Sequence, residues 1–172
     1  MDDLGFDETI LSGLWNGDET GISNVAELEK VVCTKGAREI RKATSRERGS
    51  NVTVRCAMNA AGGFEVPPFF IFPRKRMNAA LTGNTPPGSV GHCNEKGTGY
   101  MDSKLFVTRL HHFAQYTKCT KDKPHILIID GHESHKTLDA VDFCRNNRII
   151  LISLPPHSTH RMQPLDCTFL RA

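Results

Sequence analysis

The chain has 172 residues, of which 38% are hydrophobic and 24% are charged, a composition typical of a folded globular protein and unlike that of a disordered chain. This length suits one domain, which we expect to span residues 1–172. The formal net charge of +3 at pH 7 is too small to indicate a nucleic-acid partner by itself.

Neither the N-terminus nor the apolar runs predict a membrane partner. The first ten residues, MDDLGFDETI, are acidic and lack the apolar centre of a signal peptide. The longest apolar runs, PPFFIF and ILII, are too short to span a bilayer. The six cysteines are dispersed without a CxxC pair, which is typical of reduced thiols in a soluble intracellular protein.

The first predicted elements are strands. Residues 10–17, ILSGLWNG, predict a short strand that ends at Asp18. Apolar residues alternate over 52–58, as a strand with one buried face requires. Two glycines then predict a tight turn, and residues 64–72 predict the partner strand of a hairpin. Pro67 and Pro68 indicate a bulge or an edge position in that partner strand.

The second half of the chain alternates helices with strands. Residues 73–101 are rich in turn formers and predict a long loop. Asp102 is a candidate cap for the helix that follows. Residues 125–130 and 148–154 predict apolar strands, separated by a helix over 136–147, and Pro164 fits the first turn of one more helix. Two fully apolar strands around a helix are typical of a parallel βαβ unit covered by helices. The fold class predicted is therefore α/β, with a mixed five-stranded sheet flanked by helices.

Three aspartates occupy comparable places in these elements. Asp18 follows the first strand, Asp130 follows the strand over 125–130, and Asp166 lies near the start of the last helix. Ligands of open α/β sheets bind outside the carboxyl ends of the parallel strands, so Asp130 points to the expected site. If the first strand neighbours that of Asp130, Asp18 and Asp130 face each other across one crevice, and a cation must offset their repulsion. Oxygen ligands suit Mg²⁺ or Mn²⁺, and two ions about 4 Å apart could support phosphodiester cleavage. Each aspartate alone is equally consistent with a turn or cap residue.

Four longer motifs carry a resemblance to a known family. WNGDETGIS, SRERGSNVTVRCAMNAAGGFEVPPFFIF, LIIDGHESHK and LPPHSTHRMQPLD resemble the catalytic domain of the pogo and tigger transposases. These belong to the DDE superfamily and are related to the jerky and centromere protein B group. The resemblance runs from about Leu14 to Phe169, and it places the family's three catalytic aspartates on Asp18, Asp130 and Asp166.

The resemblance implies an RNase H-like fold and a DNA-binding endonuclease that cuts transposon ends and joins the freed 3′ hydroxyl to a target. It implies two Mg²⁺ or Mn²⁺ ions on the three aspartates, DNA as partner, a possible homo-oligomer on transposon ends, and residence in the nucleus. Full-length members carry N-terminal helix-turn-helix domains that do not fit here. We therefore expect a fragment whose C-terminal helix is cut short.

Basic residues between the first two strands are candidates for DNA contact. Phosphate contacts of this kind position DNA without reading its sequence. A solvated surface is the alternative for such a charge run, and RKR at 74–76 forms a second basic knot. The candidate DNA-binding residues are Lys35, Arg38, Arg41, Lys42, Arg46 and Arg48.

Two HxxH pairs, His132 with His135 and His157 with His160, raise the alternative of a zinc site. No cysteine joins them at ligand spacing, so we expect His132, His135 and His160 instead to hydrogen-bond the aspartates and backbone around the acidic site. Glu19 follows Asp18 directly, and adjacent strand residues face opposite ways. We therefore expect Glu19 to be structural or to orient the loop rather than bind the first metal.

Two classes of function stay open from the sequence. The chain is either a metal-dependent DDE endonuclease or transposase domain, or a domesticated or decayed relative that binds nucleic acid without cutting it.

Overall fold

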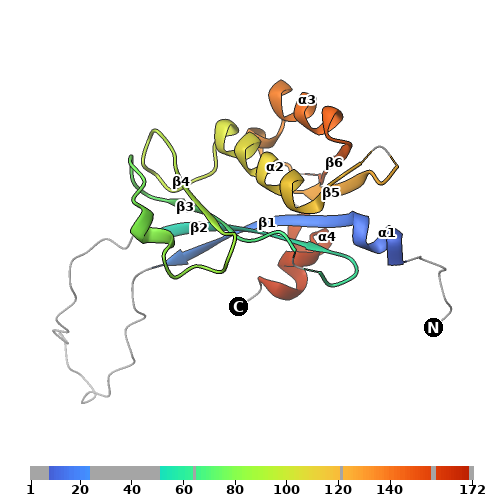
Figure 1. The fold of residues 1–172 in the computed structure, drawn as a ribbon, viewed down its shortest axis with the longest axis horizontal. Helices are drawn as coiled ribbons and strands as arrows, with labels where there is room; N and C mark the ends of the chain where they lie inside the picture. The colour runs from blue at the N-terminus through green and yellow to red at the C-terminus, as the bar shows by residue number, and fades with distance from the viewer. Residues whose placement is uncertain (1–7, 24–50, 64, 121, 156–157, 171–172) are drawn as a thin grey trace, which may run out of the picture.

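The computed structural model describes residues 8–23, 51–63, 65–120, 122–155 and 158–170, which form one mixed sheet with helices on both faces (Figure 1). The strand order is β4-β3-β2-β1-β5-β6. β1 runs antiparallel to β2 and parallel to β5. β3 is antiparallel to β2 and parallel to β4, and β6 is parallel to β5. The strands are β1 Leu14–Ser23, β2 Asn51–Asn59, β3 Phe69–Phe72, β4 Val90–Cys93, β5 His125–Ile129 and β6 Ile149–Ser153.

Two longer helices cover one face of the sheet, and the C-terminal turns lie on the other, as Figure 1 shows. α2 and α3 cover the first face, whereas α4 and the π-helical turn η3 lie against β1 from the opposite side. In the described part of the chain, no helix combines the length and apolarity that crossing a membrane requires. The helical segments are α1 Glu8–Gly13, η1 Ala79–Thr82, α2 Ser103–Thr117, η2 Glu133–His135, α3 Leu138–Asn146, α4 Thr159–Met162 and η3 Leu165–Phe169.

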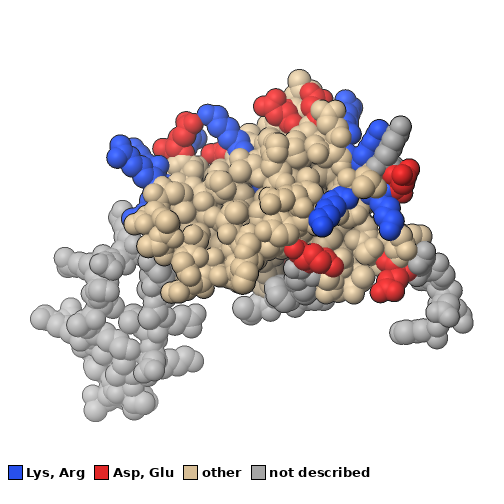
Figure 2. Space-filling model, in the orientation of Figure 1, with Lys and Arg blue, Asp and Glu red and all other residues tan. Residues whose placement is uncertain are grey.

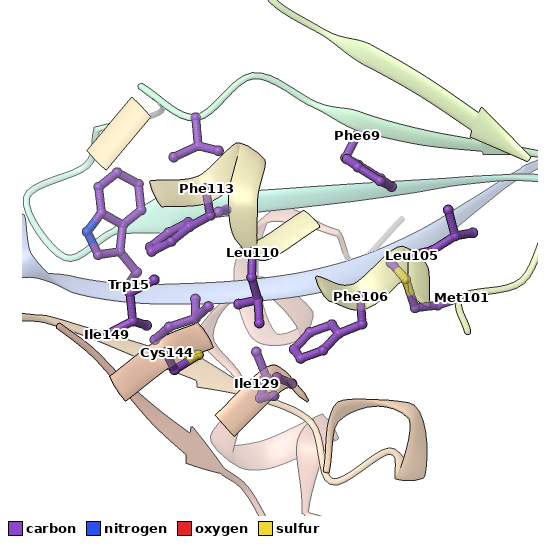
Figure 3. Packing of buried hydrophobic residues seen from close by; sticks show 14 of the residues in the cluster. Trp15, Phe69, Met101, Leu105, Phe106, Leu110, Phe113, Ile129, Cys144 and Ile149 are labelled. Carbon is purple, nitrogen blue, oxygen red and sulfur yellow. The ribbon is translucent and has the colours of Figure 1, made fainter. Parts of the chain in front are cut away.

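The hydrophobic core fills the space between α2, α3 and the sheet (Figure 3). Phe106, Leu110 and Phe113 recur at the three- and four-residue spacing of one helix face, and all three are buried. Trp15 of β1 meets Phe113 edge to face, with ring centroids 5.4 Å apart. Asp102 accepts a hydrogen bond from the Leu105 amide, which confirms it as the N-cap of α2.

The sheet has six strands rather than five. The additional strand, β4, lies within the predicted loop over 73–101 and has only four residues, one of them Gly91. It pairs with β3, which is therefore an inner strand rather than an edge. The return strand predicted over 64–72 is confined to Phe69–Phe72, because Pro67 and Pro68 supply no backbone N–H to a ladder.

The first strand also differs from the prediction over 10–17. Residues Glu8–Gly13 form α1, and β1 continues to Ser23 because β2 pairs with it along its length. Pairing with a neighbouring strand outweighs the weak strand preference of Asp18 and Gly21. Asp18 consequently lies in the middle of β1 rather than at its end.

The remaining helices and strands agree with the prediction to within a few residues, with one difference in burial. β5, α3 and β6 form the predicted βαβ unit. β6 is not covered on both faces, however, because Ile150 is 50% and Ile152 is 42% exposed. β6 is the last strand in the sheet, and an edge strand has fewer neighbours to cover it.

Candidate functional site

β1 presents two consecutive acids to opposite faces of the sheet. Trp15 and Gly17 face α2 and the core, so the alternation of a strand directs Glu19 to the same side. Asn16 and Asp18 face the other side, where η3 lies. This placement agrees with the prediction that Glu19 does not share the role of Asp18.

The predicted neighbour relation between the strands of Asp18 and Asp130 is confirmed. β1 and β5 are parallel and adjacent, with Asn16 opposite Ile128. Asp18 and Asp130 each lie two residues beyond that pair. The backbones that carry the two aspartates therefore leave the same region of the sheet.

Hydrogen bonds fix the turn that carries Asp166 beneath β1. Asn16 Oδ1 accepts from the Leu165 amide at 2.9 Å, and the fully buried Gln163 donates its Nε2 to the Gly17 carbonyl at 3.5 Å. Pro164 precedes the first turn of η3, and Asp166 lies in that turn, as the sequence predicts. The turn is short, but these bonds attach it to the strand that bears Asp18.

Asp18 and Asp166 form a pair of carboxyl groups on this face. Burial raises the pKa of Asp18, and so does Asp166, which hydrogen-bonds to Asp18 and carries a like charge. The hydrogen bond from the Glu19 amide lowers it, and the net result is a pKa of about 7. The Glu19 amide donates to Asp18 Oδ1 at 2.7 Å. The second oxygen, Oδ2, is buried and receives no hydrogen bond from any donor in the described residues. Such a pair needs a shared proton or a cation.

Asp130 joins a different cluster, on the side of the sheet that faces α2. Its Oδ1 lies 2.8 Å from Nδ1 of the buried His135. His135 Nε2 lies 2.9 Å from Arg55 Nη1 and 3.7 Å from Glu19 Oε1, and Arg55 also pairs with Glu19. The guanidinium of Arg55 stacks over the ring of Phe106, 5.1 Å from its centroid. Four charged or titratable side chains thus form one chain of contacts.

The pKa values of the two carboxyl groups on this side move in the opposite direction from that of Asp18. Burial raises the pKa of Asp130, but His135 and Arg55 outweigh burial and lower it overall. The pKa of Glu19 is lowered in the same way, by His135 and Arg55 against its burial. Burial lowers the pKa of His135, whereas the Asp130 and Glu19 carboxylates raise it, and the carboxylates prevail. This cluster thus stabilises the charged forms of its side chains, whereas the face of Asp18 favours the neutral form of that carboxyl group.

The two clusters differ in how well they suit a metal ion. Asp18 and Asp166 offer hard oxygen ligands without a counterion, and the donor-free Oδ2 of Asp18 fits a divalent cation. Asp130 is already held by His135. Over the described ranges, no three His, Cys, Asp or Glu side chains gather closely enough to hold one ion. The structure brings together two of the three predicted ligands and leaves the third beside them on the neighbouring strand.

The histidine predictions have mixed outcomes. His135 Nδ1 lies 2.8 Å from Asp130 Oδ1, within ion-pair distance of the predicted aspartate. His132 accepts a hydrogen bond from the backbone amide of Ser134 and so caps η2, which is a backbone contact of the predicted kind. His157 and the side chain of His160 lie outside the described residues, as do all six basic residues from Lys35 to Arg48. Four of the described cysteines, Cys56, Cys93, Cys119 and Cys144, are free thiols.

Arg55 is the principal residue of the cluster that sequence reasoning missed. It sits in the alternating run NVTVRCAM at a position that faces the core, where an isolated charge is costly without a partner. The apolar alternation over 52–58 predicts the opposite face of β2 as the buried one, whereas Arg55 and Ala57 are the residues that face the core, so the sequence carried no signal for a buried Arg55. Its partner, Glu19, lies 36 residues away in the sequence, so the pairing itself required the fold.

Comparisons with known proteins show the fold and the family. The fold is similar to that of the Mos1 transposase in its paired-end complex with the left transposon end, with a TM-score of 0.53 and 14% identity over 93% of this chain and 40% of that one. A pre-cleavage Mos1 transpososome matches with a TM-score of 0.50 and 11% identity, over 88% of this chain and 39% of that one. The mixed sheet with helices on both faces is thus the RNase H-like architecture of that catalytic domain.

A curated relative from Cochliobolus lunatus, named MFS-type transporter clz9, is 31% identical over 156 residues. Those residues are 89% of this chain but only 17% of that protein, so the chain spans about one sixth of the relative's length. The model of the DDE superfamily endonuclease family matches residues 49–171, which contain Asp130 and Asp166 but not Asp18. The chain therefore belongs to the DDE superfamily endonucleases.

Proposed function

We propose that this chain is the catalytic domain of a transposase that cleaves and joins DNA phosphodiesters with the help of Mg²⁺ or Mn²⁺. The observation that carries the proposal is the pair formed by the buried Asp18 and the half-buried Asp166, in which the pKa of Asp18 is raised to about 7 and one of its oxygens has no donor among the described residues. A structural aspartate is ordinarily hydrogen-bonded or solvated. A buried carboxyl pair without a cationic partner is the arrangement found at functional sites.

Asp18, Asp166 and Asp130 are the residues that would hold the two proposed ions. Two such ions supply an activated water and offset the charge on the leaving oxygen in phosphodiester cleavage. Asn16 and Gln163 position the turn that bears Asp166. His135 orients Asp130, and Arg55 with Glu19 holds His135 in place. Full assembly requires the Asp130 carboxylate to turn from His135 toward Asp18.

DNA is the proposed substrate, since the fold is that of a transposase crystallised with transposon ends. The six basic residues between β1 and β2 are the proposed phosphate contacts, because the segment that bears them leaves β1 a few residues after Asp18. A homo-oligomer on the DNA ends and residence in the nucleus follow from this substrate. The finer assignment to the pogo and tigger group rests on the motifs alone.

The test is strand cleavage of a transposon-end duplex in Mg²⁺ or Mn²⁺, comparing wild type with Asp130→Asn. The matched control is Asp142→Asn, which changes an exposed aspartate on α3 outside the cluster. We expect cleavage by wild type and the control and none by Asp130→Asn, with DNA binding retained by all three. Cleavage by Asp130→Asn at the wild-type rate would refute the assignment.

A second candidate function is nucleic-acid binding without cleavage, as in a domesticated or decayed relative. The observation that favours it is the contact between Asp130 and His135, which engages the aspartate away from the other two. If this candidate is right, wild type, Asp130→Asn and Asp142→Asn bind the duplex equally, and none of the three cuts it in either metal.

A further inference from the structure

β6 and β4 are the two edge strands of the sheet, and β6 lacks the features that usually keep an edge strand from pairing with another chain. The residues of β6, IILIS, include no charge, proline or glycine. Edge strands of soluble proteins usually carry such features, because a bare edge is a template for another strand. β4, at the other edge, has four residues and includes Gly91.

The backbone of β6 offers hydrogen-bonding groups along this edge. His125 donates its amide to the Arg148 carbonyl at 3.1 Å, and the Leu154 amide donates to the Ile129 carbonyl at 2.9 Å. These bonds fix which residues of β6 direct their backbone N–H and C=O groups toward β5. Because the direction alternates along a strand, Ile149, Leu151 and Ser153 direct their N–H and C=O groups away from β5. β6 is the outermost strand of the sheet in the described residues.

A groove of about 720 Å³ runs beside this edge, beneath α3. Its volume lies within the ~300–1,000 Å³ range of ligand sites. Apolar side chains of α3, β5 and β6 line it, so it suits the side chains of a peptide better than a phosphate backbone. The apolar lining residues are Pro124, Ile129, Val141, Cys144, Ile149, Ile150 and Leu151.

The charges around the groove are basic. Arg145 and Arg148 lie at the end where β6 begins, and Lys136 lies toward the other end, where it pairs with Glu133. The lining includes no Asp or Glu, and Arg145 and Arg148 have no ion-pair partner among the described residues. Figure 2 shows basic side chains gathered at this end of the molecule, around α3 and the segment before β5.

We propose that β6 and this groove bind an extended segment of a partner protein, added to the sheet as a further strand. The segment carries apolar residues at alternate positions, which enter the groove, and acidic residues at its ends, which meet Arg145, Arg148 and Lys136. Main-chain bonds give such strand addition its affinity, and the alternate pockets give it specificity. The proposal does not depend on the catalytic function of the aspartates.

The test measures fluorescence anisotropy with a labelled peptide, acetyl-Asp-Glu-Val-Thr-Ile-Thr-Val-Glu-Asp-amide. We expect saturable binding to wild type that weakens about tenfold in Arg145→Glu/Arg148→Asn. Asn suits position 148 because Arg148 has a φ of 58°, in the left-handed region that Asn tolerates. The matched control, Lys75→Glu/Arg76→Asn, changes exposed basic residues that follow β3 and should bind as wild type does.

Backbone methylation separates strand addition from other ways of filling the groove. Only alternate amides of an added strand bond to β6. We therefore compare two methylated peptides. One carries N-methyl groups on the amides of the three apolar residues, and the other carries them on the amides of the two threonines. One of the two patterns should abolish binding, and the other should leave the affinity within about threefold of that of the unmodified peptide.

Three results would overturn the proposal. The first is no saturable binding of the peptide, or equal effects of the two methylation patterns. The second is that wild type binds a DNA duplex of about 20 base pairs but not the peptide, and that Arg145→Glu/Arg148→Asn loses the binding of DNA. That result would assign the basic residues around the groove to phosphate contacts. The third is self-association of the protein alone that the peptide does not disrupt, which would assign the edge to a second copy.

Discussion

Asp18 and Glu19 are consecutive residues of one strand, yet the two faces of the sheet treat their carboxyl groups in opposite ways. On the face of η3, burial and Asp166 raise the pKa of Asp18 to about 7. On the face of α2, Arg55 and His135 lower the pKa of Glu19. The difference arises from partners rather than from residue type. One face is balanced internally, whereas the other is left in need of a proton or a cation.

The largest expected effect comes from removing Arg55, the cation of the face of α2, which we call the balanced face. Arg55→Met leaves Glu19 and Asp130 with His135 alone, and we expect a loss of about 3 kcal/mol in the free energy of unfolding near neutral pH. Urea denaturation monitored by the single tryptophan measures it. The double variant Arg55→Met/Glu19→Gln should recover part of the loss, because it also removes the stranded carboxylate. No recovery would show that Arg55 acts through its packing on Phe106.

The opposite face predicts a variant that gains stability. Asp18 titrates near 3.8 when unfolded and at about 7 when folded, so the native state binds more protons between these values. The free energy of unfolding of the wild type therefore falls as the pH rises through this window. Asp18→Asn removes the repulsion with Asp166 and keeps an acceptor for the Glu19 amide. We expect it to be about 1–2 kcal/mol more stable than wild type at about pH 8 and equal to it at about pH 4.

Urea denaturation of wild type and Asp18→Asn across this pH range, without divalent metal, checks the prediction. Asp142→Asn is the control and should follow the wild type at every pH. A constant difference between Asp18→Asn and wild type across the range would contradict the unbalanced pair.

The smallest expected effect is a titration shift within the balanced face. Asp130 and Glu19 raise the pKa of His135. The stabilisation from a charged His135 is therefore complete below its unfolded pKa of about 6.5 and is lost as the pH rises through the higher folded value. Asp130→Asn should lower the pKa of His135 by about one unit, measured by NMR of the ring protons. An unchanged value would mean that the 2.8 Å contact contributes little in solution.

The elements that have strong local signals were predictable from the sequence, and those that depend on distant partners were not. The apolar periodicity of α2, the cap at Asp102 and the βαβ unit around Asp130 are local features, and each is present. β4 was missed because it has four residues and no apolar alternation. β1 was misplaced because its pairing with β2, which begins only at Asn51, keeps residues 18–23 extended.

The site followed the same division. Spacing and resemblance predict Asp18, Asp130 and Asp166 as the metal ligands, and this assignment stays a prediction. The attachment of η3 to β1 through Asn16 and Gln163 could not be read from the sequence, because these contacts join residues more than 140 positions apart. Nor could the contact of His135, the partner of Asp130, with the buried Arg55 be predicted, because Arg55 is distant in sequence and the alternation over 52–58 places it on the face predicted to meet solvent.

The most direct test of the account is whether the unbalanced face binds a divalent cation. Isothermal titration with Mn²⁺ at about pH 8, with the change in melting temperature as a second readout, compares wild type with Asp18→Asn, Asp166→Asn and Asp142→Asn. The account predicts binding and thermal stabilisation of wild type and Asp142→Asn, and at least tenfold weaker binding in the other two variants. Equal Mn²⁺ affinity in all four proteins would contradict it.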